Sequence, residues 1–275
     1  MMLSTLDLAL WAPVMVGGVL AGASSGALGV YIVGMRIPFL GVCVSHAALA
    51  GAVFGALAGL KGTWMLLPAL AGAMIAALAL GLAKPERFRT DNNTVMNLLF
   101  TGSMGLAFLG LGLFPVLGKS DHDVRALLWG SLNYCRWPDV WLMAGVTILL
   151  FLFLVLTAKE MRAILFSRTD AAAAGIHVTL VWTTFLILTA LVLTVNFQTV
   201  GGLMIFSLMT NPAAAAFLLV RGSNRALATA AALGAFSGLA GFLVSAITDL
   251  PTGATIVLWS AGVVGVAAWF RSHRR

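Results

Sequence analysis

The chain has 275 residues, of which 61% are hydrophobic and 9% are charged. This composition leaves too little polar surface for a water-soluble globule, and repeated apolar runs of about 20 residues favour membrane helices over the alternating strands of a β-barrel. The net charge of +7 comes from basic residues scattered among short loops, so it reports membrane topology and does not indicate nucleic-acid binding.

The apolar runs predict an all-α bundle of nine membrane-spanning helices, with eight as the alternative count, in one domain covering residues 1–275. No basic residue precedes Arg36, so the first run is expected to stay in the membrane and not to be removed as a signal peptide. The predicted spans are 8–33, 37–60, 63–83, 94–116, 139–158, 179–196, 200–220, 226–247 and 254–270.

The basic residues predict the orientation of these spans. Counting back from a cytoplasmic C-terminus places the loops alternately inside and outside. Four basic residues then lie outside and the other twelve of the 16 lie inside, the outer ones being Lys61, Lys119, Arg125 and Arg136. The positive-inside rule therefore predicts a multi-pass protein of the inner (plasma) membrane, with its N-terminus outside and its C-terminus cytoplasmic.

Glycine recurs at every fourth position in three of the spans. Such stripes let helices approach closely, because apolar burial gives little net drive within lipid. Packing within the chain is the simpler interpretation, and a contact between subunits is the alternative for one stripe. The stripes are Gly18, Gly22 and Gly26; Gly51, Gly55 and Gly59; and Gly234 and Gly238.

The second predicted span carries the first candidate site, at Cys43 and His46. Counted from Arg36 at about 1.5 Å per residue, His46 lies roughly 15 Å deep, near the middle of the bilayer, where an ionisable group is a functional candidate. Cys43 and His46 project from adjacent turns, and thiolate and imidazole both bind late first-row metals. The alternative is structural: His46 bonds a neighbouring helix and Cys43 packs as a small apolar residue.

The predicted cytoplasmic loop 159–178 contains its own short helix. Ser167 and Asp170 have the spacing of a capping box, and Gly175 supplies a stop. This segment is either an ordinary surface helix or a lever that docks into a partner. The alanines that favour helix between the cap and the stop are Ala171, Ala172, Ala173 and Ala174.

The seventh predicted span contains Asn211 followed by a proline near its centre, which predicts a kink and exposed backbone polar groups at membrane depth. Ser207, Thr210 and Asn211 are candidates for lining a translocation path, and a purely structural kink is the alternative. Farther along the chain, the run 249–253 predicts a compact external turn shaped by Asp249, Pro251 and Gly253.

Several segments, in this order, resemble the membrane permease subunits of ABC importers for zinc, manganese and iron. The resemblance runs from about residue 34 to residue 259. It rests on Phe-Leu-Gly at 39–41 with Ser-His-Ala-Ala-Leu at 45–49, on Val-Gly-Gly-Leu at 200–203 with Asn-Pro-Ala-Ala at 211–214, and on the run 249–258, which is the most diagnostic.

The resemblance implies a dimeric membrane core, expected as a homodimer in the lipid bilayer, with cytoplasmic ATP-binding subunits and an extracytoplasmic metal-binding protein. The segment from Asp170 to Gly175 looks like the family's coupling helix, and His46 matches the family's membrane histidine. Many members have an aspartate four residues before this histidine, where the chain has Val42. If Cys43 replaces it, a thiolate favours softer ions, so zinc is expected first as transported substrate, with manganese or iron next and no permanently bound cofactor.

Two other classes of function are weighed against the permease. A stand-alone secondary transporter needs carboxylates within the membrane, but Asp7, Asp139 and Asp249 all lie at span ends. An intramembrane hydrolase needs a nucleophile and a base together, but the adjacent Ser45 and His46 diverge by about 100° around a helix. The sequence also lacks a Walker-type Gly-Lys-Ser/Thr loop, so ATP hydrolysis is expected in a separate subunit and the chain is not expected to be an enzyme.

Overall fold

A computed structural model describes residues 8–82, 92–120 and 132–273, and within these ranges the regular elements are all helices. Seven of these helices are long and apolar enough to cross a membrane, and α3 (Leu66–Leu82) and α10 (Gly202–Leu219) are shorter apolar helices. The prediction of an all-α membrane bundle is confirmed over these ranges. The count of nine crossings stays a prediction.

Each predicted span coincides with one helix to within a few residues. The remaining long helices are α1 (Leu8–Gly34), α2 (Phe39–Leu57), α4 (Asn92–Val116), α6 (Trp137–Leu156), α9 (Val178–Val200), α11 (Ser223–Thr248) and α12 (Thr252–His273). The short elements are α7 (Ala158–Phe166), α8 (Arg168–Ala173), and the 3-10 turns η1 (Gly62–Met65) and η3 (Leu132–Tyr134).

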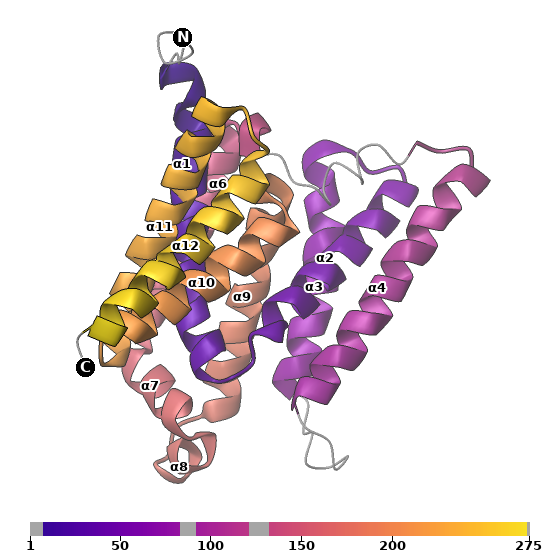
Figure 1. Cartoon of the computed structure of the whole chain (residues 1–275). Helices are drawn as coiled ribbons and strands as arrows, with labels where there is room; N and C mark the ends of the chain where they lie inside the picture. Colours follow the sequence, from indigo (N-terminus) through magenta and orange to yellow (C-terminus); the bar gives the residue numbers. More distant parts are fainter. Residues whose placement is uncertain (1–7, 83–91, 121–131, 274–275) are drawn as a thin grey trace. The chain divides into compact units, whose positions relative to one another are not determined.

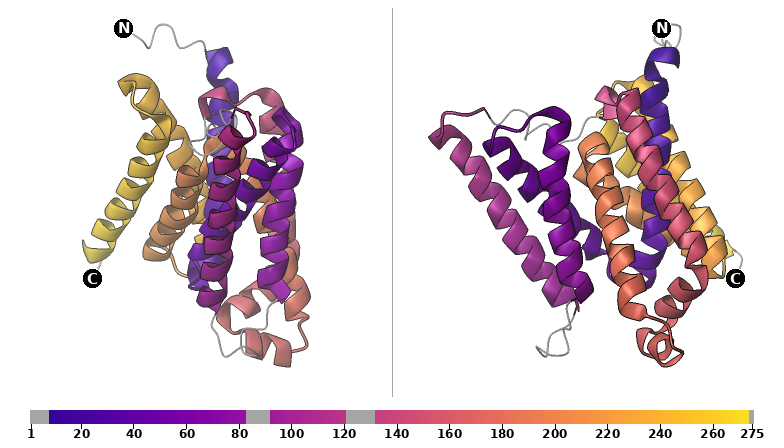
Figure 2. Two further views of the ribbon diagram at one scale, coloured as in Figure 1. Left: turned by 90° about the vertical axis from the view of Figure 1, so that its right-hand side faces the viewer. Right: turned by 180° about the vertical axis from the view of Figure 1, so that it is seen from behind.

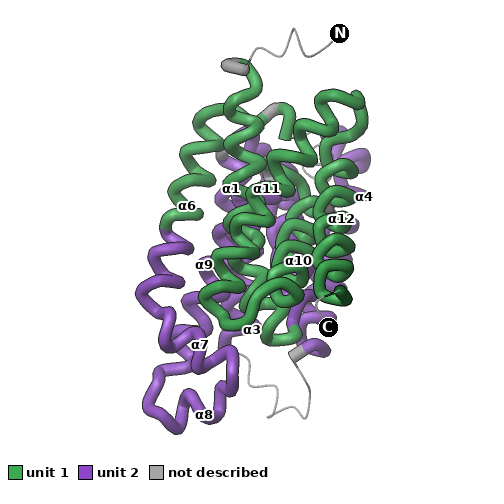
Figure 3. The backbone as a smooth tube through the Cα atoms, turned by 60° about the vertical axis from the view of Figure 1, so that its left-hand side comes forward, with its two compact units in different colours: residues 1–36, 129–148, 199–275 green, residues 37–128, 149–198 purple. Residues whose placement is uncertain are grey.

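The chain forms two compact units, which Figure 3 colours separately. Unit 1 comprises residues 1–36, 129–148 and 199–275, and unit 2 comprises residues 37–128 and 149–198. In unit 1, α1 packs against α10 and α11, and α10 packs against α11 and α12. Figure 1 shows the start of α1 and the end of α12 at opposite ends of unit 1.

Glycine brings α1 and α11 into backbone contact in unit 1. A Cβ atom on Gly22 would overlap the carbonyl oxygen of Gly234, and a Cβ atom on Gly234 would overlap that of Gly22. One turn away, a Cβ atom on Gly18 would lie 3.2 Å from the carbonyl oxygen of Gly238. Two of the stripes therefore pack against each other within the chain, which confirms the simpler interpretation for them.

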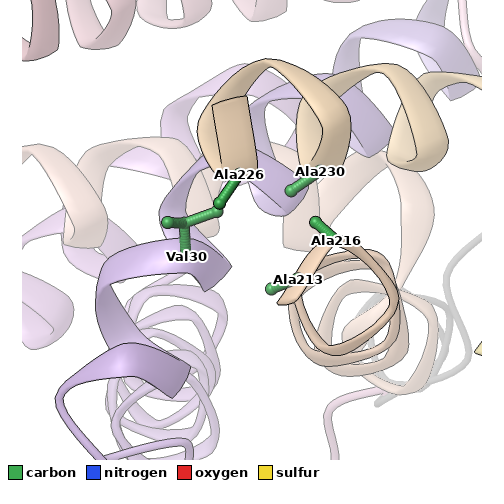
Figure 4. Packing of buried hydrophobic residues seen from close by; sticks show 5 residues of the cluster. All are labelled: Val30, Ala213, Ala216, Ala226 and Ala230. Carbon is green, nitrogen blue, oxygen red and sulfur yellow. The ribbon is translucent and has the colours of Figure 1, made fainter. Parts of the chain in front are cut away.

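Small side chains continue this close packing where α1, α10 and α11 meet. Figure 4 shows the buried cluster of Val30, Ala213, Ala216, Ala226 and Ala230, whose members are at most 1% exposed. These short side chains let three helices converge without bulky residues between them.

In unit 2, α2 packs against α3 and α4. The second glycine stripe serves this contact, because Cβ atoms on Gly51 and Gly55 would overlap the backbone and ring of Pro68 on α3. Gly59 instead has a φ of 90° in the turn after α2, a conformation that glycine adopts without strain. Figure 2 shows α7 and α8 at the end of this unit where α9 begins.

The sequence missed α7, which it treated as part of a loop. This helix is nine residues long and has both apolar and charged faces, and it buries Met161 and Ile164. The apolar run that predicts a membrane span ends before it, so span counting alone assigns the polar residues that follow to a connection.

Candidate metal path

His46 lies on α2 with one ring nitrogen already engaged. Its Nδ1 atom is 2.8 Å from the carbonyl oxygen of Val42, four residues earlier. A carbonyl oxygen only accepts, so Nδ1–H is the donor, and in the neutral imidazole Nε2 then has the free lone pair. Backbone hydrogen bonds of this kind orient histidines that bind metals.

One aromatic ring contacts the imidazole directly. The ring of Phe100, on α4, meets His46 edge to face with the centroids 4.9 Å apart, and Phe39 in turn packs against Phe100 at 5.1 Å. His46 stays half-buried, so its ring is held but not enclosed. This arrangement fixes the direction in which Nε2 points.

The structure separates Cys43 from His46 in accessibility. Cys43 is a free cysteine with no exposed surface, whereas His46 is half-buried. Across the described ranges, no group of three or more His, Cys, Asp or Glu residues is placed to hold a metal. Among the described residues, the arrangement thus offers one imidazole nitrogen and no closed cage.

The polar side chains of α10 form hydrogen bonds, two of them within α10 itself and one to another helix. The hydroxyls of Ser207 and Thr210 donate to the carbonyls of Met204 and Phe206, both at 2.9 Å. Asn211 Nδ2 donates to Ser260 Oγ on α12, also at 2.9 Å. Asn211 therefore ties α10 to α12 beside the proline, a role that the sequence did not reveal because Ser260 lies 49 residues away.

The predicted turn at 249–253 joins α11 to α12. Asp249 adopts a left-handed conformation with φ 54° and ends α11, and the carbonyl of Pro251 accepts from the Thr255 amide at 3.1 Å. A Cβ atom on Gly253 would lie 3.5 Å from the side chain of Met204.

Side chains from outside this turn hold it in place. Ser245 donates to the carbonyl of Leu250 at 2.6 Å, and its hydroxyl lies 2.9 Å from that of Thr252. Thr252 also donates to Asn133 Oδ1 at 3.0 Å. Ser245 and Asn133 were not candidates from the sequence, and they show that this turn is a fixed structural corner.

The predicted short helix of the 159–178 loop is α8. Ser167 Oγ accepts from the Asp170 amide at 3.2 Å, so the predicted N-cap forms. Gly175 has a φ of 82° and ends the helix. The amide of Gly175 donates to the carbonyl of Ala172, and the amide of Ile176 donates to the carbonyl of Ala171. Ala171 is buried, and the outer surface of the segment presents Ala172, Ala173 and Ala174.

A cation–π contact fastens α8 to α9. The Arg168 guanidinium lies 3.9 Å above the centre of the Trp182 ring, which in turn stacks on Phe185 at 5.5 Å. Burial lowers the pKa of Arg168 from its ordinary value, because removing solvent disfavours its charge. The contact thus joins α8 to a long apolar helix.

Comparison with known proteins identifies a family of transport proteins. The family model "ABC 3 transport family" matches residues 7–271. The manganese transport system membrane protein MntC of Halalkalibacterium halodurans is 28% identical over 92% of this chain and 84% of its own length. The manganese import system permease protein ScaB of Streptococcus gordonii is 25% identical over 95% of this chain and 91% of its own.

A solved structure has the same fold. It is titled "PsaBC from Streptococcus pneumoniae in complex with Fab", and the matching chain superposes with a TM-score of 0.81 and 20% sequence identity, covering 97% of this chain and 95% of that chain. The family model spans nearly the whole sequence, and the helices agree with it. The chain therefore belongs to the ABC 3 transport family, as a membrane permease subunit without an ATPase site of its own.

Proposed function

We propose that this chain is the permease subunit of an ATP-driven importer for a divalent transition metal, with manganese first and iron or zinc behind it. The observation that carries the proposal is the hydrogen bond from His46 Nδ1–H to the carbonyl of Val42, which leaves Nε2 of the neutral imidazole free to bind an ion. We propose that His46 lies at membrane depth, as counting residues from Arg36 predicts. The expectation of zinc rested on Cys43 as a soft ligand and gains no support, since the named relatives are manganese systems. Manganese also suits a site with few sulfur ligands.

The proposed transport cycle is alternating access. A binding protein outside hands over the ion, which passes His46 while it keeps water or other oxygen ligands. Two permease chains, expected to be identical, form the path, and two ATPase subunits bind the cytoplasmic α8 segments. Closure of the ATPase pair would shift α8 and, through Arg168 and Trp182, α9. The N-terminus is proposed outside and the C-terminus in the cytoplasm.

The coupling role of α8 predicts an uncoupled variant. Trp182→Leu removes the ring under Arg168, a contact expected to contribute on the order of 1 kcal/mol. We expect metal uptake per ATP hydrolysed to fall about threefold to fivefold while hydrolysis continues. Reconstituted vesicles give both rates. Trp141→Leu is the matched control, because Trp141 is 71% exposed on α6 and should leave the ratio unchanged; equal ratios in the two variants would argue against α8 as the coupling element.

Cys43 is the weaker of the two ligand candidates. Its thiol is enclosed, so Cys43→Ser is expected to leave manganese uptake within about twofold of wild type. Uptake of radioactive manganese into cells is a sufficient measurement. A loss of manganese uptake with normal membrane levels of the protein would restore Cys43 as a ligand.

Complementation of growth tests the proposed function as a whole. The chain, produced with the ATPase and the binding protein that we expect to be encoded beside it, should restore growth of a bacterial strain without manganese importers on manganese-limited medium. Omitting the ATPase should remove the rescue. Growth without the ATPase would support a secondary transporter instead.

A further inference from the structure

Unit 1 carries an apolar groove between α11 and α12 that ends in a basic pocket. The groove has a volume of about 860 Å³, and its walls include Phe236 on α11 and Trp259, Val266 and Phe270 on α12. Phe236 is 52% exposed and Phe270 47%, so large apolar rings face outward there. Figure 1 shows α11 and α12 running side by side toward the C-terminus.

The basic pocket adjoins the groove at the end of α12. Leu219 and Phe270 line both cavities, and Arg221 and Arg271 line the smaller one, of about 260 Å³. Both arginines are exposed. Among the described residues of unit 1, the acidic ones are Asp139, in the first turn of α6, and Asp249, at the far end of α11. The two guanidinium groups are thus available for an anion from outside the protein.

We propose that this groove and pocket form a binding site for an anionic phospholipid. One acyl chain of the lipid lies in the groove, and Arg221 and Arg271 bind the phosphate of the lipid head group. The groove follows α12 from Phe270 past Trp259 to Thr255, about 22 Å at 1.5 Å per residue, which is more than half of a roughly 30 Å hydrocarbon layer. One acyl chain that enters from the arginine side therefore fits within the length of the groove, and basic pockets beside spanning helices are typical sites for acidic lipid head groups.

Two glycines of α12 provide a matched test of the groove. Gly262 lines it and Gly265 does not, and a Cβ atom on either would meet nothing within 4 Å. Gly262→Leu should fill the groove without disturbing the helix, while Gly265→Leu makes the same chemical change elsewhere. For the pocket, the double variant Arg221→Gln, Arg271→Gln is paired with Lys159→Gln, an exposed basic residue on α7.

The measurement is native mass spectrometry of the full chain titrated with phosphatidylglycerol or phosphatidylcholine. We expect wild type, Gly265→Leu and Lys159→Gln to bind phosphatidylglycerol in preference to phosphatidylcholine. Gly262→Leu and the double arginine variant should bind phosphatidylglycerol about tenfold more weakly. The leucine occupies the space of the acyl chain, and each lost arginine removes a severalfold contribution to the binding of an anionic lipid.

Three results would overturn the proposal. They are equal binding of the two lipids by wild type, unchanged phosphatidylglycerol binding in Gly262→Leu and the arginine variant, or lipid-free wild-type dimers that Gly262→Leu separates into monomers. The last result would assign the groove to a second copy of the chain.

Discussion

Replacement of His46 with alanine is expected to lower the rate of manganese uptake by about a hundredfold or more, while the protein still reaches the membrane and assembles with its ATPase. The physical reason is that Nε2 is the one imidazole nitrogen left free by the hydrogen bond to Val42. Without it, the ion meets no replacement ligand at this point of α2. Uptake of radioactive manganese into vesicles measures the loss, and co-purification of the ATPase measures assembly.

A second substitution at His46 separates metal binding from structure. The amide nitrogen of asparagine reaches about as far as Nδ1, so His46→Asn can still donate to the carbonyl of Val42. It has no atom at the position of Nε2. We expect His46→Asn to be as inactive as His46→Ala. If asparagine restores uptake, the hydrogen bond is what matters and His46 is a structural residue.

Gly22→Leu is expected to prevent stable folding of unit 1. Its side chain would need the space of the Gly234 carbonyl, which belongs to helix backbone and cannot rotate away. Overpacking of a close contact typically costs about 1–3 kcal/mol and more where backbone must move. We expect a sharply lower yield of folded protein and a lower melting temperature in detergent, measured by fluorescence-detected chromatography after heating.

Gly145→Leu is the control for this substitution. Gly145 is exposed on α6, within unit 1, and a Cβ atom there would meet nothing within 4 Å. It should retain the yield and melting temperature of wild type. Equal behaviour of the two leucine variants would mean that α1 and α11 do not depend on backbone contact at Gly22.

The sequence predicted features whose cause is local. Runs of about 20 apolar residues mark helices regardless of what surrounds them, and all nine predicted runs are helical. The cap at Ser167 and the stop at Gly175 form for the same reason, since their hydrogen bonds stay within a few residues. The amphipathic helix α7 was not predicted, because its apolar face is short and it does not form a span.

Contacts between distant residues escaped prediction. Asn133 and Thr252 are 119 residues apart, and no local pattern pairs them. The three-residue spacing of Cys43 and His46 correctly put them on neighbouring turns, but spacing does not tell which part of a helix its neighbours cover. Packing leaves Cys43 without exposed surface and His46 half-buried, a difference that the spacing did not predict. The ranking of zinc first lost its support because the named relatives are manganese systems.

Transport by the purified complex tests the central claim most directly. The permease, its neighbouring ATPase and its binding protein are reconstituted in vesicles, and the uptake of manganese, iron and zinc is measured with ATP and with a non-hydrolysable analogue. Our account predicts accumulation of manganese that requires ATP hydrolysis and exceeds that of zinc at equal free concentrations. Accumulation that is independent of ATP, or a complex that hydrolyses ATP without moving any of the three ions, would contradict it.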